Sequence, residues 1–170
     1  ITRCLVGSEM CIRDRSSDYG RNIFVNPLTQ KNFAVAIINH RSSTLDSIYP
    51  AQIHDVKAAV RYLRAKAKEL NLDTSFIGIT GYSSGGHLAA MAGTSSYDRS
   101  VEGKVGKYLN FSSHIDAVVD FYGPTDMSVF DDCLKRMGKE FKSPRKIPLF
   151  DNLVDQVPKE VQRANPITYI

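Results

Sequence analysis

The chain has 170 residues, of which 42% are hydrophobic, and its formal net charge at pH 7 is +4. These values suit one ordinary globular domain. The modest positive charge gives little support to a nucleic-acid partner, and no apolar run is long enough to span a membrane. We therefore expect neither a nucleic-acid partner nor a membrane span.

Residues 1–15 do not resemble the rest of the chain. The segment from Cys4 to Arg15 matches, residue for residue, one reading frame of a common transposon-type DNA sequencing adapter. We expect residues 1–15 to be non-native and a partial domain to occupy residues 16–170, as in a translated metagenome assembly. With Cys4 and Cys11 set aside, only Cys133 remains, so no disulfide framework is predicted. The sequence leaves open the oligomeric state of the protein and whether it is cytoplasmic or exported.

The next part of the chain predicts a strand followed by a helix. Asn26-Pro27 indicates a turn or a helix start, and the apolar run from Phe33 to Asn39 predicts a strand buried on both faces. A long helix is expected from Pro50 to about Asn71. Its apolar stripe consists of Ile53, Val56, Val60, Leu63, Ala67 and Leu70. The basic residues of this helix lie mostly off the stripe and are expected to form a solvated face. They are Lys57, Arg61, Arg64 and Lys68.

The stretch from Ile77 to Ala90 has the pattern of a strand, a sharp turn and a helix. Within it, residues 81–85 fit G-x-S-x-G, the nucleophile elbow, in which a serine is held in a strained conformation at the tip of the turn. Ser83 is therefore the predicted nucleophile. Gly81 and Gly85 provide the small side chains that so tight a reversal requires. The N–H of Ser84, at the positive end of the following helix, is the predicted oxyanion donor.

A third strand is predicted from Ile115 to Tyr122, ended by Gly123-Pro124. Strands alternating with helices indicate parallel βαβ units, so we expect an α/β fold with a mostly parallel sheet flanked by helices. From about residue 127 to residue 160 the pattern changes to short charged helices broken by prolines. We interpret this part as a cap-like excursion from the domain.

Structural roles are expected for the other histidines near these elements. His87 lies four residues after Ser83 on the same helix, so its side chain is expected to reach along the helix and to serve the core or a hydrogen bond rather than act as the base. His40, His54 and His114 show no ligand spacing, and no metal site is predicted.

The acidic residues and Tyr82 receive similar interpretations. Asp55 is expected to pair with Arg41 as a structural tie. Three further carboxylates are interpreted as structural or substrate-edge groups, namely Asp116, Asp120 and Asp126. Tyr82, beside the predicted nucleophile, either lines an acyl pocket or simply packs.

Four segments carry a resemblance to a known family. They are Tyr49-Pro50-Ala51-Gln52 with Asp55, Ala58, Ala59 and Tyr62-Leu63-Arg64; Gly81 to Ala90; Phe121-Tyr122-Gly123-Pro124-Thr125-Asp126; and Asn165-Pro166-Ile167. Together they resemble an α/β-hydrolase fold esterase of the bacterial feruloyl and acetyl-xylan esterase and hormone-sensitive-lipase-like group. The resemblance implies a serine carboxylic-ester hydrolase that forms an acyl-enzyme on Ser83, needs no cofactor or metal, and acts on a small-molecule ester.

The chain departs from this family pattern at both ends. The resemblance implies a His-Gly-Gly segment before Tyr19 and a triad acid and histidine on loops after later strands. None of them is found in the 170 residues, so we expect a partial fold that lacks N-terminal and C-terminal strands and has no esterase activity by itself. The missing segment belongs to a central strand, whose place is expected to be left as a gap, lost by collapse, or filled by Cys4-Leu5-Val6.

Other functions stay open from the residues alone. An arylformamidase or a serine peptidase of the same fold would use the same elbow, and a binding protein of this fold would have lost its catalytic residues. A flavodoxin-like nucleotide binder is a more distant alternative, because residues 40–43 contain no glycine for a phosphate loop.

Overall fold

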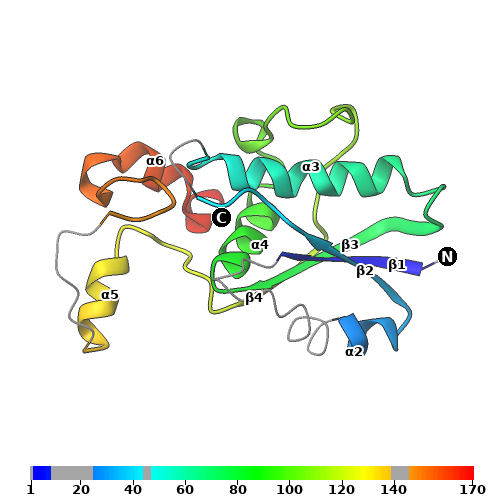
Figure 1. Ribbon diagram of the computed structural model, residues 1–170, viewed down its shortest axis with the longest axis horizontal. Helices are drawn as coiled ribbons and strands as arrows, with labels where there is room; N and C mark the ends of the chain where they lie inside the picture. Colours follow the sequence, from blue (N-terminus) through cyan, green and yellow to red (C-terminus); the bar gives the residue numbers. More distant parts are fainter. Residues whose placement is uncertain (1, 9–24, 44–46, 139–145) are drawn as a thin grey trace.

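The computed structural model describes residues 2–8, 25–43, 47–138 and 146–170 (Figure 1). Within these segments, four strands form one sheet in the order β2-β1-β3-β4. The strands are β1 (Thr2–Ser8), β2 (Phe33–Ile38), β3 (Leu72–Tyr82) and β4 (Ala117–Phe121). Each neighbouring pair is parallel. The predicted α/β fold with a parallel sheet is therefore confirmed.

The segment that contains Cys4, Leu5 and Val6 occupies a central place in the sheet. Strand β1 lies between β2 and β3, with Leu5 opposite Val35 on one side and Gly78 on the other. Of the three expected outcomes for this place, the structure has the third, since the strand that fills it contains Cys4, Leu5 and Val6. Residues 9–15 lie outside the described segments.

Strand β2 agrees with the predicted range, but it is not buried on both faces as expected. It lies at the edge of the sheet, most of its side chains are half-buried, and Ile37 is 44% exposed. A run of apolar residues indicates that a strand is largely buried, but it does not indicate whether the strand has one neighbouring strand or two.

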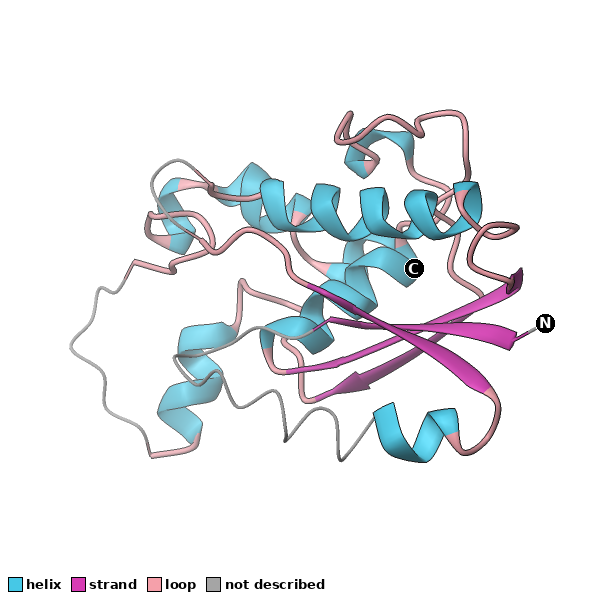
Figure 2. Ribbon diagram, turned by 45° about the vertical axis from the view of Figure 1, so that its right-hand side comes forward, coloured by secondary structure: helices cyan, strands magenta, loops and turns pink. Residues whose placement is uncertain are grey.

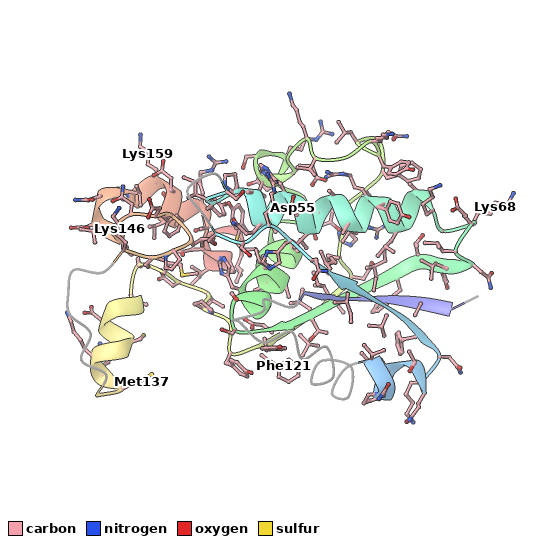
Figure 3. All side chains as sticks on the ribbon, viewed as in Figure 1. Asp55, Lys68, Phe121, Met137, Lys146 and Lys159 are labelled. Carbon is pink, nitrogen blue, oxygen red and sulfur yellow. The ribbon has the colours of Figure 1, made fainter. Side chains whose placement is uncertain are left out.

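Helix α3 (Ala51–Ala65) is shorter than the predicted range, which extended to Asn71. After Ala65 the chain continues in turns as far as Asn71, which adopts a left-handed conformation with a φ of 53°. The Leu72 N–H donates to the Ala67 carbonyl at 2.8 Å and closes the last of these turns before β3 begins. Leu70 therefore lies outside the apolar stripe and is 44% exposed, and Lys68 points outward beyond the helix end (Figure 3).

Two of the basic residues on α3 are buried, which corrects the prediction of a solvated face. Lys57 is fully buried and Arg61 is 1% exposed. The Lys57 ammonium donates to the Ser95 carbonyl at 2.8 Å and to Glu102 Oε2 at 3.3 Å, and the Arg61 guanidinium also pairs with Glu102. The sequence could not reveal these contacts, because Glu102 lies more than forty positions away.

Helix α4 (Ser84–Thr94) packs beside α3 on one face of the sheet (Figure 2). It lies so close to β4 that a Cβ atom on Gly93 would be 2.1 Å from Val118 Cγ2. The core lies between these helices and the sheet, and it includes Ile53, Val56, Val60, Ile77, Ile79, Leu88 and Met91. The close contact of α4 with the sheet places the start of this helix at the carboxyl ends of β3 and β4.

The remaining elements are short. They are α2 (Asn26–Thr29), the 3-10 helix η2 (Arg99–Val101), α5 (Phe130–Arg136), η3 (Val154–Gln156), α6 (Pro158–Arg163) and η4 (Pro166–Tyr169). Helix α2 begins where Asn26-Pro27 predicted it, and α5, η3 and α6 are the short helices expected after residue 127. Residues 139–145 of that region lie outside the described segments.

Candidate functional site

Ser83 joins β3 to α4 and adopts a backbone conformation that side chains rarely occupy. Its φ is 56° and its ψ is −124°, outside the ordinary strand and helix regions. A non-glycine residue held at such angles stores of the order of 1–3 kcal/mol of strain, which the surrounding contacts must offset. The strand, the turn and the helix therefore follow the arrangement that the sequence predicted for a nucleophile elbow.

The turn at Ser83 is fixed by hydrogen bonds on both of its sides. The Ser83 N–H donates to the Phe121 carbonyl at 3.0 Å, and the Ser83 carbonyl accepts from the His87 N–H at 3.0 Å. Phe121 is the last residue of β4, so it lies, like Ser83, at the carboxyl ends of the strands (Figure 3). The first N–H groups of α4 have no carbonyl partner within the helix, as at any helix start. The N–H of Ser84 is the first of them.

Glycines allow the elbow to pack tightly, and the closest approach is at Gly86. A Cβ atom there would lie 2.1 Å from Asp120 Oδ1 and 3.1 Å from the Gly81 carbonyl oxygen. Gly123 is equally crowded, since its Cβ atom would lie 2.2 Å from the His87 backbone nitrogen. The sequence predicted Gly123 only as the end of a strand and predicted no separate role for Gly86, although the Gly85-Gly86 pair at the start of an Ala-rich helix is a signal of close packing.

Ser83 opens on a cavity of about 440 Å³. The residues that line it come from α4, from the chain after β4 and from residues 40–52. The lining is mostly apolar and includes Leu88, Met127, Ile147 and Leu149, and its polar side chains include His40, Ser43 and Gln52. No charged side chain lines the described part of this cavity.

Three contacts hold the walls in place. Arg41 forms a paired interaction with Asp55, with its Nη2 2.8 Å from Oδ1 and its Nε 2.9 Å from Oδ2, which confirms the predicted tie between this loop and α3. The Tyr49 N–H donates to the Leu149 carbonyl at 2.8 Å. The Met127 N–H donates to Asn165 Oδ1 at 2.8 Å. Residues far apart in the sequence are thus brought to one cavity.

His87 is a buried neutral side chain at this cavity. It is 2% exposed, and its Nδ1 lies 2.8 Å from the Pro124 carbonyl oxygen. Because a carbonyl can only accept, Nδ1 carries the proton, and Nε2 is a bare nitrogen with no partner in the described residues. Burial lowers the pKa of His87 to about 4, although the bond to Pro124 opposes the shift. A base with that pKa is poorly matched to catalysis near neutral pH.

The three carboxylates of the region make structural contacts. Asp116 Oδ2 accepts the Ile77 N–H at 2.8 Å at the amino end of β4, and Asp126 Oδ1 accepts from Asn165 Nδ2 at 2.8 Å. Asp120 Oδ1 accepts the Gly123 N–H at 2.7 Å. The ring of Tyr82 lies 6.5 Å from that of Tyr122, and of these two only Tyr122 lines the cavity in the described residues.

Neither a base nor a metal cluster accompanies Ser83 in the described part of the chain. No hydrogen bond there joins the Ser83 hydroxyl to a histidine or a carboxylate, and no group of three or more His, Cys, Asp or Glu side chains is placed to hold a metal ion. None of the described helices has both the length and the apolar character to cross a membrane.

The parallel sheet, the strained strand-to-helix junction and the cavity beside it define a protein of the α/β-hydrolase fold. The family model BD-FAE matches residues 4–170, so this chain belongs to the BD-FAE family. The match begins inside the segment that resembles sequencing adapter.

Known relatives carry esterase names. The probable carboxylic ester hydrolase LipM of Mycobacterium tuberculosis is 28% identical over 148 residues, which are 84% of this chain and 32% of LipM. Esterase LipC of the same organism is 30% identical over 70% of this chain and 28% of LipC. The chain thus spans about a third of the length of these relatives.

A solved structure described as bifunctional GH43-CE from Bacteroides eggerthii superposes with a TM-score of 0.87 at 40% identity, over 99% of this chain and 25% of that one. A truncated carbohydrate esterase from gut microbiota has a TM-score of 0.81 at 35% identity, over 99% of this chain and 62% of that one.

Proposed function

We propose that the complete protein is a serine carboxylic-ester hydrolase and that Ser83 is its nucleophile. The observation that carries this proposal is the strained backbone of Ser83, with φ of 56°, at a strand-to-helix junction that opens on a 440 Å³ cavity. The membership of this chain in the BD-FAE family and the esterase names of its relatives support the same reaction class.

The mechanism uses the hydroxyl of Ser83 to attack the carbonyl carbon of a small-molecule ester. The oxyanion of the tetrahedral intermediate accepts a hydrogen bond from the Ser84 N–H, at the positive end of α4. Gly81 and Gly85 give the turn its small radius. Loss of the alcohol leaves an acyl-enzyme, which water hydrolyses to release the acid and restore the serine.

The proton transfers in this mechanism need a base, which we assign to residues outside the 170 of this chain. His87 is unsuited because its Nδ1 proton is held by the Pro124 carbonyl and its pKa is lowered to about 4. We likewise assign the acid that orients the base to residues outside this chain, since Asp116, Asp120 and Asp126 each bind backbone or amide groups. The 170-residue chain by itself is then expected to show no appreciable turnover of p-nitrophenyl acetate.

Labelling with a fluorophosphonate tests the nucleophile. The complete enzyme should be labelled and its Ser83→Ala variant should not, while Ser75→Ala, at the opposite end of β3, serves as the matched control and should be labelled like the wild type. Labelling that persists in Ser83→Ala would disprove the assignment. A complete protein that is never labelled would indicate a binding protein of this fold, and faster turnover of an aryl formamide or a peptide than of esters would indicate the amidase alternatives.

We also propose that residues 1–15 are non-native and that the native domain begins near residue 16, with residues 127–160 as its cap-like part. The adapter resemblance supports the first statement, and the short helices α5, η3 and α6 support the second. Sequencing of the flanking genomic DNA tests the proposal: a native reading frame that encodes residues 4–15 unchanged would overturn it.

A further inference from the structure

Asp120 has no role in the reaction as described so far, yet it lies between the two chain segments that hold Ser83. We propose that the Asp120 carboxylate is a positioning residue for the nucleophile, an inference that rests on the proposed function. The carboxylate stabilises the turn after β4, and that turn holds the backbone of Ser83 in its strained conformation. The carboxylate does not touch the reacting atoms.

Asp120 points from β4 toward the start of α4. It pairs in register with Gly81 on β3, two residues before Ser83. Its side chain lies on the α4 face of the sheet, like that of Val118 two residues earlier. Because Gly86 lacks a side chain, Asp120 Oδ1 can lie against the first turn of α4, at a place where a Cβ atom of residue 86 would be only 2.1 Å away.

The Asp120 carboxylate holds the turn that follows β4. Its Oδ1 accepts the N–H of Gly123 at 2.7 Å, which closes a short turn in which Tyr122 has a φ of 48°. A left-handed tyrosine is uncommon and needs such support. Gly123 then crosses the start of α4 at van der Waals contact, since a Cβ atom there would lie 2.2 Å from the His87 backbone nitrogen.

This turn is joined to Ser83 by a backbone hydrogen bond. The Phe121 carbonyl, which directly precedes the turn, accepts the Ser83 N–H at 3.0 Å. On the far side of the turn, the Pro124 carbonyl accepts from His87 Nδ1 at 2.8 Å. Loss of the Asp120 carboxylate would free the turn between these two anchors. The strained angles of Ser83 would then lose the contact that offsets them.

Amide hydrogen exchange of the 170-residue chain tests the proposal without any requirement for activity. The wild type is compared with three variants at position 120. Asp120→Asn keeps an acceptor oxygen, Asp120→Ser provides a weaker cap for such turns, and Asp120→Ala has no side-chain acceptor. We expect the Ser83 amide to exchange roughly 10-fold faster or more in Asp120→Ala, less so in Asp120→Ser, and nearly unchanged in Asp120→Asn. Should the alanine variant fail to fold, the serine and asparagine variants still give the comparison.

A matched control exists at the opposite end of β3. Asp73 Oδ1 accepts the Ser75 N–H at 2.9 Å in a similar side-chain-capped turn. Asp73→Ala should leave the exchange of the Ser83 amide unchanged. The proposal is overturned if Ser83 exchange does not follow the Asp, Asn, Ser, Ala order, or if Asp73→Ala accelerates it as much as Asp120→Ala does.

Kinetics of the complete enzyme separate positioning from simple loss of stability. Asp120→Ala should lower kcat by roughly 10- to 100-fold with KM changed by less than about 3-fold, because misplacement of a reacting group by a fraction of an ångström acts on the chemical step. Asp120→Asn should retain kcat within about 3-fold. An enzyme whose Ser83 is never labelled would refute the esterase proposal, whereas faster Ser83 exchange with unchanged kcat would refute the positioning role alone.

Discussion

The strained backbone of a single residue, Ser83, predicts a cost in stability that can be measured. Its φ of 56° and ψ of −124° suit glycine better than any side chain. Ser83→Gly should therefore raise the free energy of unfolding by about 1 kcal/mol, which is the strain relieved less the added entropy of an unfolded glycine. Ser83→Ala keeps the Cβ atom and should leave stability nearly unchanged. Chemical denaturation of both variants checks this, and a less stable glycine variant would contradict it.

His87 predicts a dependence of stability on pH. Burial lowers the pKa of His87 in the folded protein to about 4, whereas the unfolded side chain titrates near its ordinary value of 6.5. Between these values the unfolded chain binds a proton that the folded chain does not, so stability is lost as the pH falls from about 6.5 toward 4. At about 1.4 kcal/mol per pH unit, the loss amounts to roughly 3 kcal/mol.

The variant His87→Asn isolates this effect from the carboxylates that titrate in the same range. An asparagine amide can still donate to the Pro124 carbonyl but does not ionise. Urea unfolding at several pH values should show a smaller loss for the variant than for the wild type between pH 6.5 and pH 4. Parallel curves for the two proteins would mean that His87 does not titrate as described.

At the scale of elements, the contact between α3 and the segment after α4 depends on one carboxylate. Glu102 is the acid that faces the buried Lys57 and Arg61 in the described residues. Burial raises the pKa of Glu102, but hydrogen bonds and charges from Ser113, Lys57 and Arg61 lower it overall, so this carboxylate is charged at neutral pH.

Glu102→Gln should lower the free energy of unfolding by about 3–5 kcal/mol, because it leaves two buried cations without a counterion. The exposed pair of Lys66 and Glu69 provides the matched control, and Glu69→Gln should change stability far less, because a solvent-exposed ion pair contributes little. Thermal or chemical unfolding of both variants gives the comparison, and equal effects would contradict the assignment.

For the whole molecule, the sheet depends on β1, the strand formed by residues 2–8. Strand β1 has a neighbour on each side, so its N–H and carbonyl groups serve both β2 and β3. Without β1 these two strands would each present an unpaired edge, and the partial sheet would separate into two parts.

A proline in the middle of β1 tests this dependence. Val6→Pro removes a ladder hydrogen bond from a central strand, a position where proline is essentially not found, and should prevent cooperative folding. Thr2→Pro, at the first residue of the strand, should be tolerated. Far-ultraviolet circular dichroism during denaturation distinguishes the two, and a cooperative transition in Val6→Pro would show that the sheet does not need β1.

The sequence alone determined the local features of this protein. The α/β class, the elbow at Ser83, the start of α4 at Ser84 and the pair of Arg41 with Asp55 all follow from short-range patterns or motif spacing. The elbow and the helix start involve neighbouring residues of one motif, for which chain geometry allows few arrangements. The pair of Arg41 and Asp55 spans 14 positions, and it is inferred from the loop after a strand lying beside the helix that follows it.

The tertiary structure decided what depends on distant partners. It buried Lys57 and Arg61 against Glu102, placed β2 at an edge, ended α3 at Ala65 and brought Asp120 against Gly86. It also placed residues 2–8 at the centre of the sheet. The burial of a side chain and the neighbours of a strand depend on residues that only folding brings together. A local sequence pattern therefore cannot predict them.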